Sequence, residues 1–234
     1  MRGTFTYNGR SSSEFGILID THTSYRSANR DYTVKEVPGR NGDLTIDNGR
    51  WKNVEVSYKC GIGKNFAAKI DELRAWLMSN VGYKRLEDDW QDGYFRLARV
   101  KEAPNPQTLR SITGEFTVTF DCDPRRFLKT GETKQTFTGS GTISNPTNYE
   151  ARPLIRVYGT GTLRIGGTTI TITAANSYTD LDCDLQDAFR GTTNCNGNVR
   201  LDSGDFPVLA PGSNGVVPGS GISRVEITPR WWTI

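Results

Sequence analysis

The chain has a single histidine among 234 residues, and this scarcity narrows the catalytic chemistry open to it. A His-Glu-x-x-His zinc site needs two histidines and is excluded. No serine lies in a Gly-x-Ser-x-Gly elbow, and the Gly139-Ser140-Gly141 and Gly159-Thr160-Gly161 turns lack the Lys-Ser/Thr of a phosphate loop. His22 lies between two threonines in a polar stretch, so we interpret it as a surface or interface residue. We predict no catalytic site and no cofactor.

The chain also lacks strong charge and long apolar runs. The formal net charge is only +3, and no block of Lys and Arg stands out, so composition does not favour a nucleic-acid binder. No stretch reaches the length of a membrane helix, and we expect no membrane insertion. Polar residues follow Arg2 where a secretory signal peptide would have an apolar run, so we expect no Sec export.

Cysteine is sparse, and its spacing matches no zinc motif. The four cysteines are Cys60, Cys122, Cys183 and Cys195. Cys183 and Cys195 are close enough in sequence to close a short disulfide loop. The alternative is reduced thiols in a protein made in the cytoplasm. Composition alone leaves both open.

What the chain does have is glycine, 25 residues, together with 10 prolines, which is typical of many short strands joined by tight turns. Apolar and polar residues alternate over Val54–Cys60 and again over Phe116–Cys122, so we predict two strands with one buried face each. Asn41-Gly42 and Asn48-Gly49 are tight-turn signals. A further hairpin is predicted around Asp92-Gly93.

One helix is predicted over residues 65–80. Asn65 can cap its start, and Asn80 with Gly82 can end it. Trp76 flanks the apolar stripe. The stripe consists of Phe66, Ile70, Leu73 and Leu77. Its helical spacing predicts that this face packs on a sheet.

Composition shifts towards Thr, Gly, Ser and Asn after Lys129, so we place a domain boundary there, with domains over 1–130 and 131–234. In the second domain, Gly166-Gly167 separates two short strands, which predicts a hairpin. In that register five residues share one face: Leu163, Ile165, Thr168, Ile170 and Ile172. Short, regularly spaced strands predict a β-sandwich.

Asp180, Asp182 and Asp184 alternate in one extended segment, so their carboxylates are expected on one face. Three carboxylates there suit Ca²⁺, which prefers oxygen ligands. The alternative, which we favour, is a solvated strand face with Leu181, Cys183 and Leu185 pointing inward. We predict no bound metal.

Several motifs, in order and spacing, resemble the distal tail protein (Dit) family of siphophages. The residues from Val37 to Leu44 resemble its Pro-Gly-Arg-x-Gly-x-Leu turn, and Phe120–Pro124 resembles the end of its first domain. Asn145–Ile155 resembles the start of its second domain. The C-terminal run Glu226-Ile-Thr-Pro-Arg-Trp-Trp232, which follows the Phe206-Pro207 segment, resembles the end of the family.

The resemblance implies a β-rich N-terminal domain that closes a six-fold ring around the DNA channel, followed by a galectin-like β-sandwich. Tail-tube protein would lie on one face of the ring and a tail-associated fibre or lysin protein on the other, with DNA only passing through. The protein would be made in the host cytoplasm and located in the virion tail tip. The candidate assembly interface comprises Pro38, Gly39, Arg40, Asn41, Gly42, Trp231 and Trp232.

Trp231 and Trp232 allow two interpretations, since alternation sends one ring inward and the other outward. They either pack against a neighbouring strand or form an aromatic anchor at a partner surface. An exposed tryptophan on a sandwich also suits sugar stacking, so a carbohydrate-binding protein that contacts host cell-wall glycans is the alternative function. A hydrolase is the third hypothesis, opposed by the solitary histidine and the dispersed acids.

Overall fold

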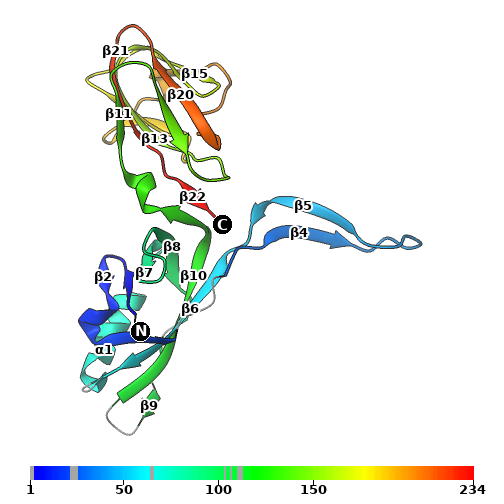
Figure 1. Ribbon diagram of the computed structural model, residues 1–234, viewed down its shortest axis with the longest axis vertical. Coiled ribbons are helices and arrows are strands. Elements are labelled where there is room, and N and C mark those ends of the chain that lie inside the picture. The colour runs from blue at the N-terminus through cyan, green and yellow to red at the C-terminus, as the bar shows by residue number, and fades with distance from the viewer. Residues whose placement is uncertain (1–2, 22–25, 64–65, 103, 106, 110–112) are drawn as a thin grey trace. The chain divides into compact units, whose positions relative to one another are not determined.

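The computed structural model describes residues 3–21, 26–63, 66–102, 104–105, 107–109 and 113–234. It is mainly antiparallel β-sheet with one α-helix, which confirms the predicted fold class (Figure 1). The chain divides into two compact units. Unit 1 comprises Met1–Arg126 together with Ile234, and unit 2 comprises Phe127–Thr233.

Unit 1 is built on a twisted antiparallel sheet with the strand order β2-β1-β7-β8-β10-β6-β3, with β9 also paired to β10. The strands are β1 (Phe5–Tyr7), β2 (Arg10–Ser11), β3 (Ile17–Thr21), β6 (Val54–Ile62), β7 (Lys84–Asp88), β8 (Tyr94–Val100), β9 (Gln107–Leu109) and β10 (Thr113–Leu128). The two predicted alternating strands are neighbours, with Phe116 opposite Cys60 and Val118 opposite Tyr58. All four of these side chains are buried, so the predicted inward face is confirmed. The β7–β8 hairpin is confirmed as well.

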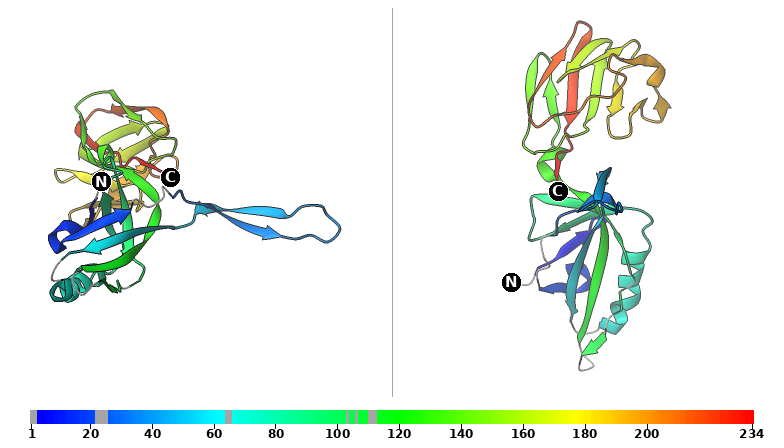
Figure 2. Two further views of the ribbon diagram at one scale, coloured as in Figure 1. Left: turned by 60° about the horizontal axis from the view of Figure 1, so that its bottom comes forward. Right: turned by 90° about the vertical axis from the view of Figure 1, so that its right-hand side faces the viewer.

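The helix α1 (Phe66–Met78) lies along one face of this sheet (Figure 2, right). Leu73 and Leu77 of the predicted stripe are buried, and Ile70 is partly buried against the same core. Trp76 is buried too, and its ring stacks on Phe15 with centroids 4.5 Å apart. Asn65 and the Phe66 side chain lie outside the described residues. The helix is therefore a core element of unit 1, as its pattern predicts.

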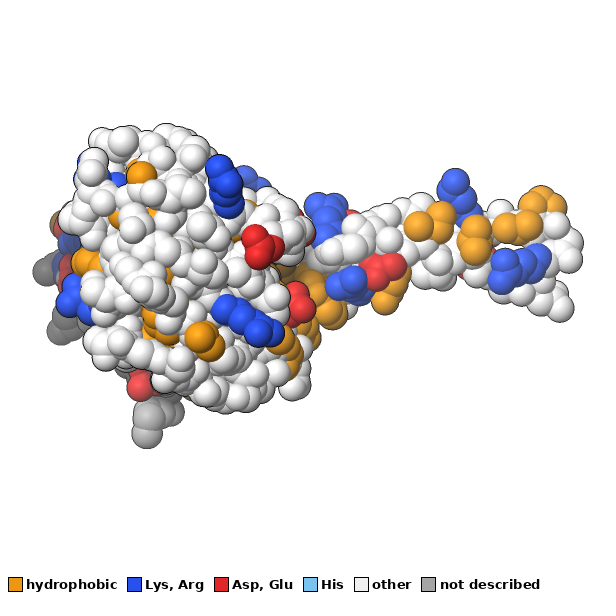
Figure 3. Space-filling view, turned by 90° about the horizontal axis from the view of Figure 1, so that it is seen from above, with side chains coloured by type: hydrophobic (Ala, Val, Ile, Leu, Met, Phe, Trp, Pro, Cys, Tyr) orange, Lys and Arg blue, Asp and Glu red, His pale blue; other side chains and the backbone are white. Residues whose placement is uncertain are grey.

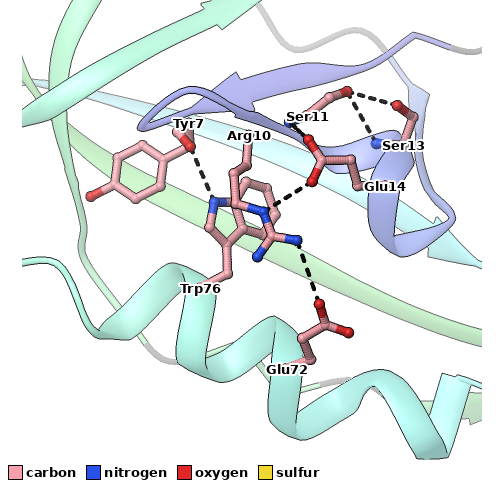
Figure 4. Close-up of polar contacts among 7 residues, drawn as sticks. All are labelled: Tyr7, Arg10, Ser11, Ser13, Glu14, Glu72 and Trp76. Carbon is pink, nitrogen blue, oxygen red and sulfur yellow. Dashed lines mark hydrogen bonds and ion pairs between the residues drawn. The ribbon is translucent and has the colours of Figure 1, made fainter.

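Polar contacts fix α1 to the N-terminal segment (Figure 4). The Trp76 indole Nε1–H donates to the Tyr7 carbonyl at 3.1 Å. Arg10 pairs with Glu14 at 2.9 Å and reaches Glu72 on the helix at 3.4 Å. Glu14 also completes a capping box for the short 3-10 helix η1 (Ser12–Phe15). The indole bond is buried, so it orients the largest side chain of this contact.

Unit 2 contains a six-stranded sheet, β11-β21-β13-β16-β17-β18, and a five-stranded sheet, β12-β20-β14-β15-β19. Their bounds are β11 (Gln135–Phe137), β12 (Gly141–Asn145), β13 (Leu154–Gly159), β14 (Gly161–Ile165), β15 (Thr168–Ile172), β16 (Thr179–Asp182), β17 (Asp187–Arg190), β18 (Thr193–Asn194), β19 (Val199–Leu201), β20 (Gly212–Pro218) and β21 (Ile222–Thr228). One buried cluster joins residues from both sheets, so the unit is a β-sandwich, as predicted.

The β14–β15 hairpin of the sandwich has the predicted register. Leu163 lies opposite Ile170, and Ile165 lies opposite Thr168. The aliphatic members of this face are buried in the core shared by both sheets. The Gly166-Gly167 pair forms the two-residue turn between β14 and β15, with Gly166 in the left-handed region at φ 55°. Local turn chemistry and alternation were sufficient to predict this element.

The cysteines are all free thiols, which decides between the two interpretations left open above. Cys60, Cys122 and Cys183 are buried, and Cys195 is partly exposed. Burial raises the pKa of the Cys60 and Cys122 thiols to about 12. These three side chains therefore act as small apolar core residues.

Candidate assembly interface

A long β-hairpin projects from the sheet of unit 1 (Figures 1 and 2). In the chain it follows β3 and precedes β6. Its strands are β4 (Arg30–Lys35) and β5 (Leu44–Trp51). Within the described residues they pair only with each other. The segment joining them contains Pro38–Gly42, so five of the predicted interface residues form the tip of this hairpin.

Ion pairs stiffen the base of the hairpin. Arg30 donates to both carboxylate oxygens of Asp47, with the closest contact at 2.8 Å. Asp31 is buried, and Arg50 and Lys52 contact it at 2.7 and 3.3 Å. The hydrogen bond from Arg50 holds the pKa of Asp31 below its ordinary value against the opposing effect of burial. The hairpin therefore leaves the unit from a fixed base.

Asn48-Gly49 was predicted as a tight turn, and this prediction is wrong. Both residues lie inside β5. Gly49 has a φ of 72°, and the pairing register shifts here, between Arg30 opposite Trp51 and Tyr32 opposite Asp47. The extra residues form a β-bulge, which uses the same left-handed glycine as a turn but bends the strand without reversing it.

Both faces of the hairpin beyond the bulge carry exposed apolar side chains. Tyr32 and Val34 lie on one face and are 49% and 57% exposed. Leu44 and Ile46 lie on the other and are 39% and 43% exposed. Figure 3 shows hydrophobic side chains interleaved with Lys and Arg along the projecting arm. A hairpin that packed on its own core would hide one of its faces.

A two-stranded hairpin whose two apolar faces are both half-exposed is only marginally stable in water by itself. Exposed apolar surface of this kind, bordered by charge, marks protein contact sites. The alternation of Tyr32 and Val34 was visible in the sequence. The arm could not be predicted as a contact surface from this pattern, because alternation looks the same whether or not a face is covered.

The tip itself is held by backbone geometry. Gly39 and Gly42 both have a φ of 79°, which L side chains rarely adopt. The Arg40 amide donates to the Val37 carbonyl at 3.1 Å. All five predicted tip residues are exposed, and Arg40 has no ion-pair partner within the described part of the chain. The guanidinium is thus free to contact another molecule.

The two tryptophans belong to unit 2 and have different surroundings. Trp231 is 3% exposed and lies in the sandwich core. Trp232 stacks on Tyr149 at 4.5 Å, and its Nε1–H donates to the Glu150 carbonyl at 2.9 Å. Trp231 is therefore a packing residue and not a surface anchor. Both rings therefore have packing partners within unit 2.

The chain around Trp231 is tightly pinned. The Arg230 amide donates to the Gly131 carbonyl at 2.8 Å, and the Leu128 amide donates to the Trp231 carbonyl at 2.9 Å. A Cβ added to Gly131 would lie 2.3 Å from the Trp231 nitrogen, so only glycine fits this approach. The C-terminal run that carries the predicted family motif therefore has a structural role, because it binds the first residues of unit 2.

The acidic triplet is neither a metal cluster nor a solvated face. Asp180 and Asp182 are buried, and each binds an arginine in bidentate fashion: Arg156 at 2.7 and 2.8 Å, and Arg230 at 2.7 and 2.8 Å. No metal-like cluster of His, Cys, Asp or Glu occurs among the residues that the structure describes.

The expected alternation fails after Asp182 because β16 ends there. Asp184 is exposed, and Leu185, predicted to point inward, is 73% exposed on the following turn. Of the three residues predicted to point inward, Leu181 and Cys183 are buried and Leu185 is not. His22 lies outside the described residues. No helix in the described ranges is long and apolar enough to cross a membrane.

Comparison with known proteins finds similarity in fold and none in sequence families. No protein family and no curated protein matches the sequence. Among solved structures, the chain is similar to SPP1 Dit (gp 19.1), described as a paradigm of the hub adsorption apparatus in phages that infect Gram-positive bacteria. The TM-score is 0.77 at 13% sequence identity, and the match covers 99% of each chain. The likeness spans both units and confirms, at the level of fold, the resemblance predicted from the motifs.

Proposed function

We propose that this chain is the ring-forming hub of a phage tail tip, acting by assembly and not by catalysis. Its fold is that of a phage hub protein over nearly the whole length of both chains. The observation that carries the proposal is the β4–β5 hairpin, with exposed apolar side chains on both faces and Arg40 at its tip. Such an arm suits insertion into a neighbouring molecule that covers both faces.

A ring follows from the form of that contact. The arm of one protomer is a different surface from the site that would receive it, so the interface is heterologous, and heterologous contacts close into rings or grow into filaments. We infer a hexamer, as the family resemblance implies, with unit 1 around the DNA channel and unit 2 a galectin-like sandwich. Tail-tube protein on one side and a fibre or lysin protein on the other complete the assembly in the virion.

The proposal is tested by placing charge on both faces of the arm. Val34→Asp combined with Ile46→Asp changes one residue on each face. Each native side chain has about half of its surface left to bury, which is worth about 1 kcal/mol. Losing both weakens each contact by about 30-fold, and burying two carboxylates weakens it further.

Light scattering on the double variant is expected to show a fall in mass relative to the unmodified chain at equal concentration. The fold of each protomer should be kept, since neither side chain is in the core, and the urea midpoint should fall only by the stabilisation that assembly provides. Val81→Asp is the matched control, because Val81 is 92% exposed in unit 1 but lies outside the hairpin. An assembly that survives the double variant, or that Val81→Asp disrupts equally, contradicts the proposed role of the arm.

A further inference from the structure

Several asparagines in the chain are followed directly by glycine, and such pairs have a chemistry of their own. The backbone nitrogen of the glycine can attack Cγ of the asparagine side chain, because glycine has no Cβ to block the approach. Asparagine is accordingly one of the labile residues of proteins. Whether a given pair reacts depends on how firmly the structure holds its two reacting atoms. The pairs are Asn8-Gly9, Asn41-Gly42, Asn48-Gly49, Asn196-Gly197 and Asn214-Gly215.

Two of these pairs are exposed in unit 1 but are held by hydrogen bonds. Asn8 donates its side-chain amide to the Asn80 side chain at 2.8 Å. In the β-bulge of β5, the attacking group itself is engaged, since the Gly49 amide donates to the Asp47 carboxylate at 2.9 Å. Reaction at Asn8 or Asn48 therefore requires a hydrogen bond to break first.

The two pairs of unit 2 are held more firmly. The Asn196 side chain accepts the Ala188 amide and donates to Asp187, both at 2.7 Å. Asn214 is 3% exposed within β20, and its side chain accepts the Ala210 amide at 2.9 Å and donates to the Ala210 carbonyl at 2.8 Å. These asparagines react only after the surrounding structure opens locally.

Asn41-Gly42 has none of these restraints. The pair lies at the tip of the arm, beyond the last paired residues Lys35 and Leu44 (Figure 1). Both residues are exposed, and neither forms a hydrogen bond within the described part of the chain, through side chain or backbone. The rotation that brings the Gly42 nitrogen to Cγ of Asn41 therefore breaks no hydrogen bond of the native tip.

The reaction needs only water and no enzyme. The Gly42 nitrogen loses its proton to hydroxide and bonds to Cγ of Asn41, the Cγ–Nδ2 bond breaks, and ammonia leaves. Water then opens the cyclic imide at either carbonyl. One product has aspartate at position 41, and the other has isoaspartate, in which the main chain runs through Cβ and Cγ.

Both products change the tip in the same direction. Each adds a carboxylate directly beside Arg40, which is the only Lys or Arg in residues 36–49. A neighbouring carboxylate pairs with the guanidinium and takes the one cation of the tip away from any other partner. Isoaspartate also lengthens the main chain, so it distorts a tip whose Gly39 and Gly42 have fixed left-handed conformations.

We propose that Asn41 is a site of spontaneous deamidation, and that its products mark chains whose arm is not covered by a neighbour. The site itself depends only on the geometry of the tip. The marking rests on the proposed function, since a neighbour that covers the arm restricts the rotation needed for ring closure.

Peptide mass spectrometry tests the site. The full chain is incubated at mildly alkaline pH in water labelled with heavy oxygen and digested in ordinary water, so that only conversion during the incubation carries the label. Asn41 is expected to convert about 5-fold or more faster than each of the other four asparagines, because they must first give up hydrogen bonds. Asn41→Gln is the matched control, since its longer side chain forms a larger ring more slowly. Equal labelling of all five asparagines, or faster labelling at any of the other four, overturns the site.

Light scattering tests the marking. At equal concentration Asn41→Asp should show a lower assembled mass than the wild type, whereas Asn41→Gln, which keeps an uncharged amide, should match the wild type. Conversion of Asn41 should also be slower in the assembled sample than in a dilute one. If the wild type assembles and Asn41→Asp assembles equally well, the marking is overturned although the proposed function stands. A wild type that never assembles overturns the marking together with the proposed function, and the labelling experiment still decides the site.

Discussion

The Asp182–Arg230 pair offers a sharp test of how unit 2 is held together. Arg230 has a φ of 60°, which is unfavourable for an arginine, and its guanidinium forms two hydrogen bonds to Asp182 at 2.7 and 2.8 Å. Asp182 also accepts the amides of Asp184 and Leu185. The pair therefore fixes the residue that leads into Trp231, and with it the C-terminal closure of the sandwich.

Asp182→Asn removes the charge but keeps the shape. Breaking a fully buried ion pair costs about 3–5 kcal/mol. The Arg230 side chain is 31% exposed, so water can partly replace the lost partner. We therefore expect the free energy of unfolding to fall by about 2–3 kcal/mol. Since whole domains are stable by only about 5–15 kcal/mol, urea unfolding resolves this change.

The pH dependence has a defined sign. Burial by itself raises the pKa of Asp182, but the hydrogen bonds from Arg230 and the Leu185 amide outweigh it, so the pKa lies below its ordinary value of 3.8. A depressed carboxyl pKa contributes stability above the unfolded pKa, and this contribution is lost as the pH falls through the folded pKa. The stability difference between wild type and Asp182→Asn should therefore be constant near neutral pH and shrink below pH 3.8.

Asp184→Asn is the control from the same acidic run. Asp184 is exposed, and substitutions at exposed sites usually change stability by less than about 0.5 kcal/mol. Calcium should not change the melting temperature of any of the three proteins. Equal losses from Asp182→Asn and Asp184→Asn, together with stabilisation by calcium in the wild type, would refute the ion-pair account and restore the metal site.

Two further predictions concern the cores. Trp76→Ala should destabilise unit 1 by about 3–5 kcal/mol in urea unfolding, because it removes a buried ring and its bond to the Tyr7 carbonyl; an unchanged midpoint would show that α1 is not a core element. In the native protein at pH 8, a thiol reagent should modify Cys195 first, while the buried thiols, whose pKa values are raised, stay protected until unfolding; rapid reaction of all four would contradict the packing described.

Much of the fold follows from short-range patterns. Alternation over Val54–Cys60 and Phe116–Cys122 predicts buried faces, and helical spacing predicts the packing of α1, because each element must hide its apolar side. Turn chemistry predicts the β14–β15 hairpin as well. At Asn48-Gly49 the same signal belongs to a bulge, since a left-handed glycine serves both structures.

The candidate site was harder to predict because it depends on partners far apart in the chain. Asp182 is paired with an arginine 48 residues away, and Asp180 with one 24 residues away, so local alternation could not show that both carboxylates are buried. Alternation predicted one of Trp231 and Trp232 inward and the other outward, but both pack in unit 2, with Gly131 beside Trp231 and Tyr149 stacked on Trp232. Whether the faces of β4 and β5 are covered depends on the whole fold, so local sequence could not predict it.

The most direct test of the central claim is the absolute mass of the purified chain by light scattering over a concentration series, with negative-stain images of the same peak. The account predicts a species of about 156 kDa, six times the 26.0 kDa chain, that appears as an open ring. A mass of 26.0 kDa at every concentration, with no rings in the images, would contradict a hub that assembles through its own hairpin.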